Sequence, residues 1–228
     1  MKESNQIFDQ WPEKYDEWFE TPIGSLVKKY ESELILGLMK PKPGERILDG
    51  GCGTGIFTLD LLSMGSRVMG LDISLPMLSR AEKKLRGRAF KAIQGNLLAL
   101  PFKDHTFDHA VSITALEFIH EGKKAVDELF RVTKEGGVVV AATLNSQSPW
   151  AARRTGEGKK GHPIFRQAIF RSPDELRSLA PVEGIVRTAI HFQKEDSPEK
   201  AFEIEQRARG EDLDTGAFVA VVWTKPYA

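Results

Sequence analysis

The sequence has little cysteine, no long hydrophobic run and no excess of charge of either sign. Its 228 residues include a single cysteine, Cys52, so no disulfide can form within the chain, which suits a reducing compartment. No stretch approaches the roughly 18 apolar residues of a membrane span, and residues 1–19 lack the apolar run of a signal peptide. These absences favour a cytoplasmic protein without a membrane span.

The charge balance disfavours an extended nucleic-acid partner. Lys plus Arg and Asp plus Glu number 32 each, so the formal net charge is zero and no overall field attracts a polyanion. A local basic patch is still compatible with these numbers. With 41% hydrophobic residues the chain can bury a sizeable core, and its length favours one domain. The composition carries no signal for an oligomeric state.

Residues 5–40 show apolar and aromatic positions at helical spacing, such as Tyr15, Trp18 and Phe19. The Thr21-Pro22-Ile23-Gly24 step divides this stretch into two helices. A turn at 41–44, rich in proline and glycine, ends the second helix. The sequence therefore predicts a helical segment ahead of the rest of the fold.

Strands and helices alternate after residue 44. The patterns predict seven strands at 46–49, 67–71, 89–94, 107–113, 137–143, 184–192 and 217–224, and helices at 56–64, 75–86, 125–132 and 198–209. Such alternation requires crossovers between parallel strands, which predicts an α/β fold with helices on both faces of a mostly parallel sheet. The last two strands are expected to pair antiparallel at a sheet edge.

Residues 145–163 are polar and carry glycines together with the basic pairs Arg153-Arg154 and Lys159-Lys160. This stretch is expected to be a loop, either a mobile lid for an anionic acceptor or, as such runs more often are, a solvated connection. Ser172-Pro173 followed by two acidic residues is a helix start, with a hydroxyl cap and acids at the positive end of the helix dipole.

A glycine-dense turn at 47–55 carries the strongest functional signal. A buried strand runs through Asp49 into Gly51, Gly53 and Gly55 and then directly into a helix. Glycines let the backbone turn sharply and approach a ligand that Cβ atoms would repel. Free N–H groups and the helix dipole would favour an anionic end on that ligand. A tight turn that merely needs glycine is the alternative interpretation.

An acid at the end of the second strand favours the ligand interpretation. Asp72 is placed next to the glycine turn, where a carboxylate accepts hydrogen bonds from both hydroxyls of a ribose. A dinucleotide site has the spacing G-x-G-x-x-G/A, but here Ile56 occupies the position of the third small residue. The spacing argues against NAD and for a smaller nucleoside ligand without a pyrophosphate.

Residues 45–145 resemble the class I S-adenosylmethionine-dependent methyltransferases, within the broad group that includes ubiquinone and menaquinone biosynthesis enzymes. Beyond the glycine turn, the matching motifs are Gly95-Asn96, Leu100-Pro101-Phe102, Phe107-Asp108, Glu128, Arg131-Val132 and Glu135-Gly136-Gly137. The resemblance implies a Rossmann-like fold, S-adenosylmethionine as cofactor and S-adenosylhomocysteine as product. It further implies a single methyltransferase domain over 1–228, with an N-terminal helical lid (1–40), a cofactor-binding half (45–144) and an acceptor-side loop with C-terminal strands (145–228).

The resemblance also implies roles for individual residues. Asp49 and the backbone of Gly51, Cys52 and Gly53 would surround the methionine portion, Asp72 the ribose, Ile73 and Met77 the adenine ring, Asn96 and Leu97 the adenine edge, and Ile113, Thr114 and Phe118 the sulfonium. Tyr15 in the lid would contact the cofactor, since an aromatic face favours a sulfonium. Trp11, Trp18 and Phe19 are expected mainly to pack the lid onto the sheet.

Two positions depart from the family pattern. Gly50 replaces the usual aliphatic residue, which would remove packing under the loop, and Asn96 replaces the commoner aspartate but can still accept a hydrogen bond. Cys52 is rejected as a nucleophile because it lies in the cofactor loop.

Motifs that the sequence lacks limit the class of methyl acceptor. The segment 112–116 lacks the Asp/Asn-Pro-Pro-aromatic signature of nucleobase amino-group methyltransferases, and no acidic cluster indicates a metal. A small-molecule acceptor is therefore expected, to which the methyl group is transferred by in-line displacement. His120 is a weak candidate for a general base, and no secure catalytic residue is identified. A tRNA or protein methyltransferase, or a non-catalytic S-adenosylmethionine-binding module, is the alternative.

Overall fold

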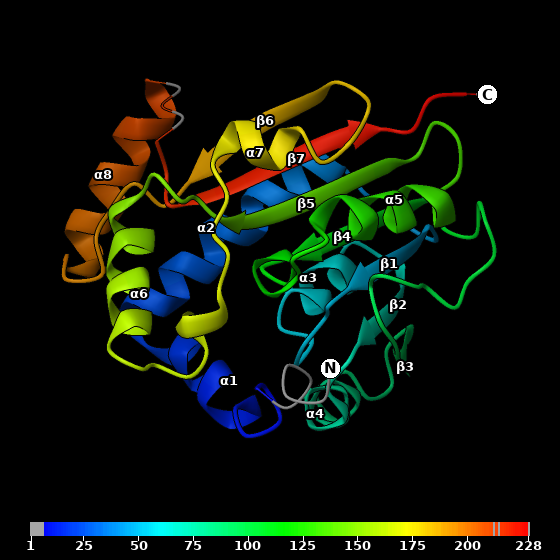
Figure 1. Ribbon diagram of the computed structural model, residues 1–228, viewed down its shortest axis with the longest axis horizontal. Helices are drawn as coiled ribbons and strands as arrows, with labels where there is room; N and C mark the ends of the chain where they lie inside the picture. Colours follow the sequence, from blue (N-terminus) through cyan, green and yellow to red (C-terminus); the bar gives the residue numbers. More distant parts are fainter. Residues whose placement is uncertain (1–6, 212, 214, 228) are drawn as a thin grey trace.

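The computed structural model describes residues 7–211, 213 and 215–227, which form one twisted sheet between helices (Figure 1). The seven strands lie in the order β3-β2-β1-β4-β5-β7-β6. They are β1 Arg46–Gly50, β2 Arg67–Asp72, β3 Phe90–Gln94, β4 His109–Ile113, β5 Val138–Leu144, β6 Gly184–Ala189 and β7 Phe218–Thr224. Strands β1 to β5 pair in parallel, whereas β7 pairs antiparallel with β5 and β6. The predicted sheet, with its antiparallel edge, is confirmed.

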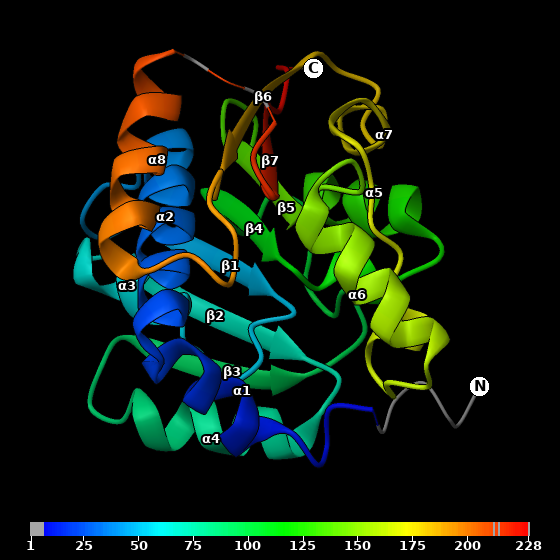
Figure 2. The same cartoon turned by 90° about the vertical axis from the view of Figure 1, so that its left-hand side faces the viewer.

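Helices cover both faces of this sheet. Figure 2 shows α2, α3 and α8 on one face and α5 and α7 on the other, while α1 and α6 lie at the carboxyl ends of the parallel strands. The helices are α1 Pro12–Glu20, α2 Pro22–Met39, α3 Thr58–Ser63, α4 Leu75–Lys84, α5 Gly122–Val132, α6 Pro149–Lys159, α7 Pro173–Arg177 and α8 Pro198–Gly210, with short 3-10 helices η2 Leu116–Phe118 and η3 Phe165–Gln167. No helix within the described ranges is long and apolar enough to cross a membrane.

The alternation of side chains along β1 divides the core into two clusters. Ile47 faces the cluster that includes Tyr30 and Ile35 of α2, and Leu48 faces the cluster that includes Leu129 of α5. Both strand residues are fully buried, as expected for a central strand covered on two faces. The two helical layers therefore hold the carboxyl end of β1 in a fixed position.

The break between α1 and α2 forms as the sequence predicts. The Thr21 hydroxyl oxygen accepts a hydrogen bond from Gly24 N at 3.1 Å, and Pro22 occupies the first turn of α2. Lys40 adopts a left-handed conformation with φ of 48° and ends α2. Because α1 ends at Glu20 and α2 begins at Pro22, Thr21 alone joins the two helices.

Several predicted boundaries shift, and one predicted loop is a helix. The helix expected from Ile56 begins at Thr58, the strand expected from Phe107 begins at His109, and residues 145–163 are not a loop, because α6 occupies Pro149–Lys159. The Ser148 hydroxyl caps α6 by accepting from Ala151 N, and Trp150 is buried against the core. This one apolar anchor and its cap outweigh the glycines and basic residues that suggested a loop.

Candidate active site

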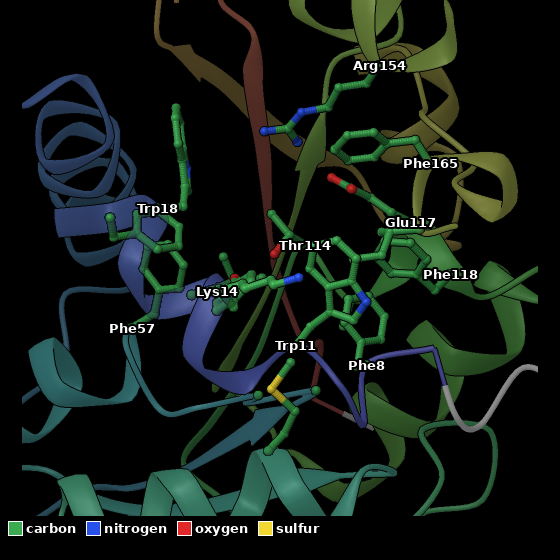
Figure 3. Close-up of a pocket in the computed structure, with 18 of the residues that line it drawn as sticks. Phe8, Trp11, Lys14, Trp18, Phe57, Thr114, Glu117, Phe118, Arg154 and Phe165 are labelled. Carbon is green, nitrogen blue, oxygen red and sulfur yellow. The ribbon is translucent and has the colours of Figure 1, made fainter. Parts of the chain in front are cut away.

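A cavity of about 300 Å³ lies at the carboxyl ends of β1, β2 and β4 (Figure 3). In open parallel sheets this is where ligands bind, at the point where the strand order reverses. Here the reversal falls between β1 and β4. The loop after β1, the end of β2 and the segment after β4 line the cavity, and residues of α1, α2 and α6 cover it.

The glycine turn after β1 adopts backbone conformations that favour glycine, as Gly51 and Gly53 show. Gly51 has φ of +80° and its Cβ position lies 2.2 Å from the Cβ of Ala115, so a side chain would not fit. Gly53 has φ of +53° and open space where a Cβ would stand. Gly51 and Cys52 donate to the carbonyl of Leu71 and continue the hydrogen bonding of β1 to β2, so these two N–H groups are already engaged.

Asp72 holds the glycine turn in place. Its Oδ2 accepts from Gly53 N at 2.8 Å, and its Oδ1 accepts from Ser74 N at 2.9 Å. Burial raises the pKa of the Asp72 carboxyl although both bonds oppose the shift. Each carboxylate oxygen keeps a further lone pair, so Asp72 can also accept hydrogen bonds from a ligand in the cavity that it lines.

Asp49 is a second buried carboxyl in the same cavity. It is 2% exposed, and its Oδ2 accepts from the Thr58 hydroxyl at 2.6 Å. Burial raises the pKa of Asp49 to about 6, the Thr58 hydrogen bond opposes the shift, and the nearby Asp72 adds to it. A cationic ligand group beside Asp49 would favour its ionised form.

Burial makes Cys52 a poor nucleophile, and packing accounts for the glycine at position 50. Burial raises the pKa of the Cys52 thiol well above its usual value, so the nucleophilic thiolate is disfavoured. Gly50 does not leave missing packing under the loop, because the Leu97 side chain lies 2.7 Å from where its Cβ would stand. The neighbouring leucine fills the space of the aliphatic side chain that the family usually has.

Helix α1 is held to the loop after β1, here called the cofactor loop (residues 51–57), by a cluster of charged side chains around the buried Asp16. Asp16 accepts hydrogen bonds from the Thr54 hydroxyl at 2.6 Å, from Arg80 Nε at 2.9 Å and from Lys84 Nζ at 2.7 Å. Burial alone would raise the Asp16 pKa, but the bonds from Lys84, Thr54 and Arg80 together hold it below its usual range. This anchor places Tyr15, the preceding residue of α1, in the wall of the cavity.

The aromatic residues of α1 both pack and line the cavity. Trp18 packs edge-on against Trp150 of α6 with ring centroids 6.3 Å apart, and Phe19 packs on Phe57 at 5.7 Å. The expected packing role is therefore present, and Trp11, Trp18 and Phe19 face the cavity as well. Burial raises the pKa of Tyr15, and a hydrogen bond with Thr114 opposes the shift, so its hydroxyl stays neutral.

Ten of the predicted cofactor residues meet around this cavity: Tyr15, Asp49, Gly51, Cys52, Gly53, Asp72, Met77, Ile113, Thr114 and Phe118. Ile73, Asn96 and Leu97 are not among the lining residues, and Asn96 is exposed with its Oδ1 accepting from Leu98 N. His120 is also exposed and outside the lining, which gives it no position for proton transfer there. His162 lines the cavity and stacks on Phe165 at 4.2 Å.

The sequence interpretation missed several lining residues far from the glycine turn: Glu31, Glu117, Trp150, Arg154 and Phe165. Two of them had a readable signal. Glu31 falls on the apolar stripe of α2 between Val27 and Ile35, where an acid is unexpected. Glu117 stands in an otherwise apolar run over 115–119. Trp150 and Arg154 lie in the segment 145–163, for which the sequence predicts a loop, and Phe165 lies just after that segment.

Fold and site together define a Rossmann-like protein whose glycine turn and adjacent acids fit a nucleoside. The open space at Gly53, the acceptor lone pairs of Asp72 and the ionisable Asp49 fit a nucleoside that carries a cationic amino-acid tail. The third small residue of a dinucleotide site is absent, since Ile56 stands there. This combination is that of a class I methyltransferase.

Comparisons with known proteins lead to the same class. Residues 48–141 match the family model described as "Methyltransferase domain". The chain is 35% identical to the malonyl-[acyl-carrier protein] O-methyltransferase of Serratia marcescens, covering 72% of each chain. It is 34% identical to the demethylmenaquinone methyltransferase of Renibacterium salmoninarum, covering 74% of this chain and 77% of that protein.

The fold is also that of a solved Thermotoga maritima structure, described as an S-adenosylmethionine-dependent methyltransferase and possible histamine N-methyltransferase. The TM-score is 0.73 at 24% identity, over 97% of this chain and 99% of the other. The chain belongs to the class I S-adenosylmethionine-dependent methyltransferases.

Proposed function

We propose that this methyltransferase acts on a small-molecule acceptor held beneath α1 and α2. The observation that carries the proposal is that one covered cavity extends from Asp72, at the end of β2, to Glu117, after β4. A macromolecular substrate would have to present its methylated group through this cover. The similar enzymes act on malonyl-acyl carrier protein and demethylmenaquinone, so their acceptors differ and the family alone does not fix the acceptor.

The proposed roles follow from position in the cavity. Asp72 accepts from the ribose hydroxyls, Asp49 faces the amino group, and Met77 packs against the adenine. S-adenosylmethionine supplies a methyl group already activated by the sulfonium. The chain therefore has to orient the acceptor, exclude water and take up a proton where the acceptor carries one.

We further propose that residues 1–40 act as a helical lid within one domain that spans 1–228, and that the enzyme works in the cytoplasm. Support for the lid comes from Asp16 and Tyr15, which tie α1 to the cofactor loop and face the cavity. The aromatic cover also excludes water from the reacting groups, which in-line transfer requires.

Calorimetry with S-adenosylmethionine, S-adenosylhomocysteine and NAD tests the cofactor part of the proposal. We expect micromolar binding of the first two and none of NAD. Asp72→Ala should weaken binding about 100-fold or more, since two hydrogen bonds to a charged acceptor are lost. Asp127→Ala, an exposed acid paired only with Lys123, is the matched control. Equal affinities of the two variants would remove Asp72 from the site.

Methyl transfer to extracted small molecules, compared with transfer to bulk tRNA and protein, tests the acceptor class. We expect product only in the small-molecule fraction, with little dependence on salt. Label in tRNA that declines steeply with salt would instead identify a nucleic-acid acceptor.

A further inference from the structure

The end of the cavity away from Asp72 carries two buried carboxyls and one guanidinium. Glu31 comes from α2, Glu117 from η2 and Arg154 from α6. These three also line a small recess of about 20 Å³, whose other walls are mostly apolar and come from α2, β5, the segment after β6 and the start of β7. In the sheet order, β5 and β7 lie on the opposite side of β4 from β1 and β2. The recess is therefore on the acceptor side of the cavity.

Glu31 is a buried acid without a protein partner. Its exposed fraction is 8%, and within the described part of the chain its carboxylate accepts no hydrogen bond and forms no ion pair. Burial raises the pKa of Glu31 to about 8, Arg154 opposes this shift, and Glu117 adds to it. An unpartnered carboxyl in an apolar wall costs free energy unless a ligand supplies the missing donor.

Glu117 is fixed in its orientation. It is 3% exposed, and its Oε1 accepts from Leu144 N at 2.7 Å and from the Thr143 hydroxyl at 3.2 Å. Its Oε2 has no hydrogen-bond donor among the described residues. One oxygen thus anchors the side chain to β5 and leaves the other available to a ligand.

Arg154 offsets only part of this negative charge. Figure 3 shows its guanidinium and the Glu117 carboxylate pointing into the same space, yet they form no ion pair within 4 Å. The guanidinium lies 5.2 Å from the Phe165 ring and 5.9 Å from the Trp150 ring. Arg171 also acts on Glu117, whereas Glu31 forms no ion pair among the described residues, so a ligand cation beside Glu31 would favour its ionised form.

We propose that the methyl acceptor is a small amine whose nitrogen binds between Glu31 and Glu117, with Glu31 as the group that receives its proton. The inference rests on the proposed methyl transfer and specifies its acceptor. Carboxylate and phosphate acceptors are disfavoured by the same two acids.

The reaction balances through these groups. The bound ammonium transfers one proton to the Glu31 carboxylate and becomes a neutral amine. The nitrogen lone pair then forms the N–C bond as the methyl carbon–sulfur bond breaks, and that bonding pair stays on sulfur. The products are a methylated ammonium and neutral S-adenosylhomocysteine, with the transferred proton on Glu31 until solvent removes it.

Calorimetry on the S-adenosylhomocysteine complex tests the proposal without requiring turnover. The probes are benzylamine, 2-phenylethylamine and tryptamine, each compared with the alcohol and the carboxylic acid of the same skeleton. We expect at least one amine to bind and no carboxylate to bind better. Repeating the titration at pH 7 in buffers of different ionisation enthalpy should show release of close to one proton on binding, because Glu31 starts mostly protonated and ends facing a cation.

Two variants test whether Glu31 is responsible for amine binding and for the proton release. Glu31→Gln keeps the shape of the side chain and should reduce amine affinity at least tenfold and abolish the proton release. Glu33→Gln, an exposed acid two residues further along α2, should change neither. Urea unfolding of both variants should show that the Glu31→Gln chain folds, since it removes a buried ionisable group rather than a packing group.

The outcomes separate the two proposals. If the wild-type chain does not bind S-adenosylhomocysteine, the proposed function itself fails. If it binds S-adenosylhomocysteine but none of the amines, or prefers the carboxylates, or if Glu31→Gln and Glu33→Gln behave alike, the amine assignment is overturned and the methyltransferase assignment stands.

Discussion

Replacing Asp16 by alanine should release α1 from the cofactor loop. Asp16 is 6% exposed and joins α1 to Thr54 in the loop after β1 and to Arg80 and Lys84 in α4. The alanine variant leaves the fully buried Thr54 hydroxyl with Lys84 as its one remaining partner, at 3.2 Å. The change is therefore directed at a polar cluster that connects α1, the loop after β1 and α4.

The size of the effect follows from burial. Each hydrogen bond to a charged group contributes about 1.5–3 kcal/mol, and Asp16 accepts three of them. The side chains of Arg80 and Lys84 are 39% and 25% exposed, so water recovers much of their solvation when the partner is lost. We therefore expect the free energy of unfolding to fall by about 2–4 kcal/mol rather than by the full sum.

Urea unfolding and calorimetry with S-adenosylhomocysteine measure the two consequences. If the docked fraction of α1 falls to a tenth, the apparent affinity falls about tenfold. Glu17→Ala, an exposed acid next in sequence, is the matched control. Equal unfolding free energies for the two variants would refute the anchor. The folded-state pKa of Asp16 lies below its usual value. The contribution of Asp16 to the free energy of unfolding of the wild type should therefore be lost only as the pH falls through about 4 and lower.

Three further changes have distinct readouts. The affinity of wild type for S-adenosylhomocysteine should fall as the pH drops below about 6, where Asp49 protonates, and Asp49→Asn should bind weakly at every pH; a parallel pH profile in the variant would exclude Asp49. Tyr15→Ala should weaken S-adenosylmethionine about fivefold to tenfold while Tyr15→Phe stays near wild type, and unchanged calorimetry for alanine would remove Tyr15 from the site. Trp150→Ala should lower the unfolding free energy by about 3–5 kcal/mol in urea, because the 3% exposed ring also donates a hydrogen bond to the Phe192 carbonyl; a loss under about 1 kcal/mol would contradict this.

The sheet could be predicted because its signals are local. β1 is a short apolar run that ends in glycine, and its two faces need two helical layers, which the alternation along the chain supplies. Helix α6 could not be predicted with the same ease. Its segment is polar and carries glycines, and the helix depends on a cap at Ser148 and on burial of Trp150, which only the tertiary structure provides.

The cofactor side of the site was likewise more accessible to prediction than the acceptor side. Asp49, the glycine turn and Asp72 lie within 24 residues of one another and form one strand–turn–helix–strand unit with a fixed spacing. The acceptor end brings together Glu31, Glu117 and Arg154 from three elements that no local pattern connects. The sequence offered only indirect signals, an acid on the apolar face of α2 at Glu31 and an acid in the apolar run 115–119 at Glu117.

The close connection between α1 and α2 couples the two ends of the cavity. Thr21 alone separates the helices, so Asp16 and Tyr15 on the cofactor side and Glu31 on the acceptor side belong to one continuous segment. Because Asp16 bonds to Thr54 in the cofactor loop itself, a cofactor that orders this loop also favours docking of α1. By reciprocity, docking of α1 raises cofactor affinity by the same factor. Cofactor binding would then also favour the docked position of the continuous helical segment that carries Glu31.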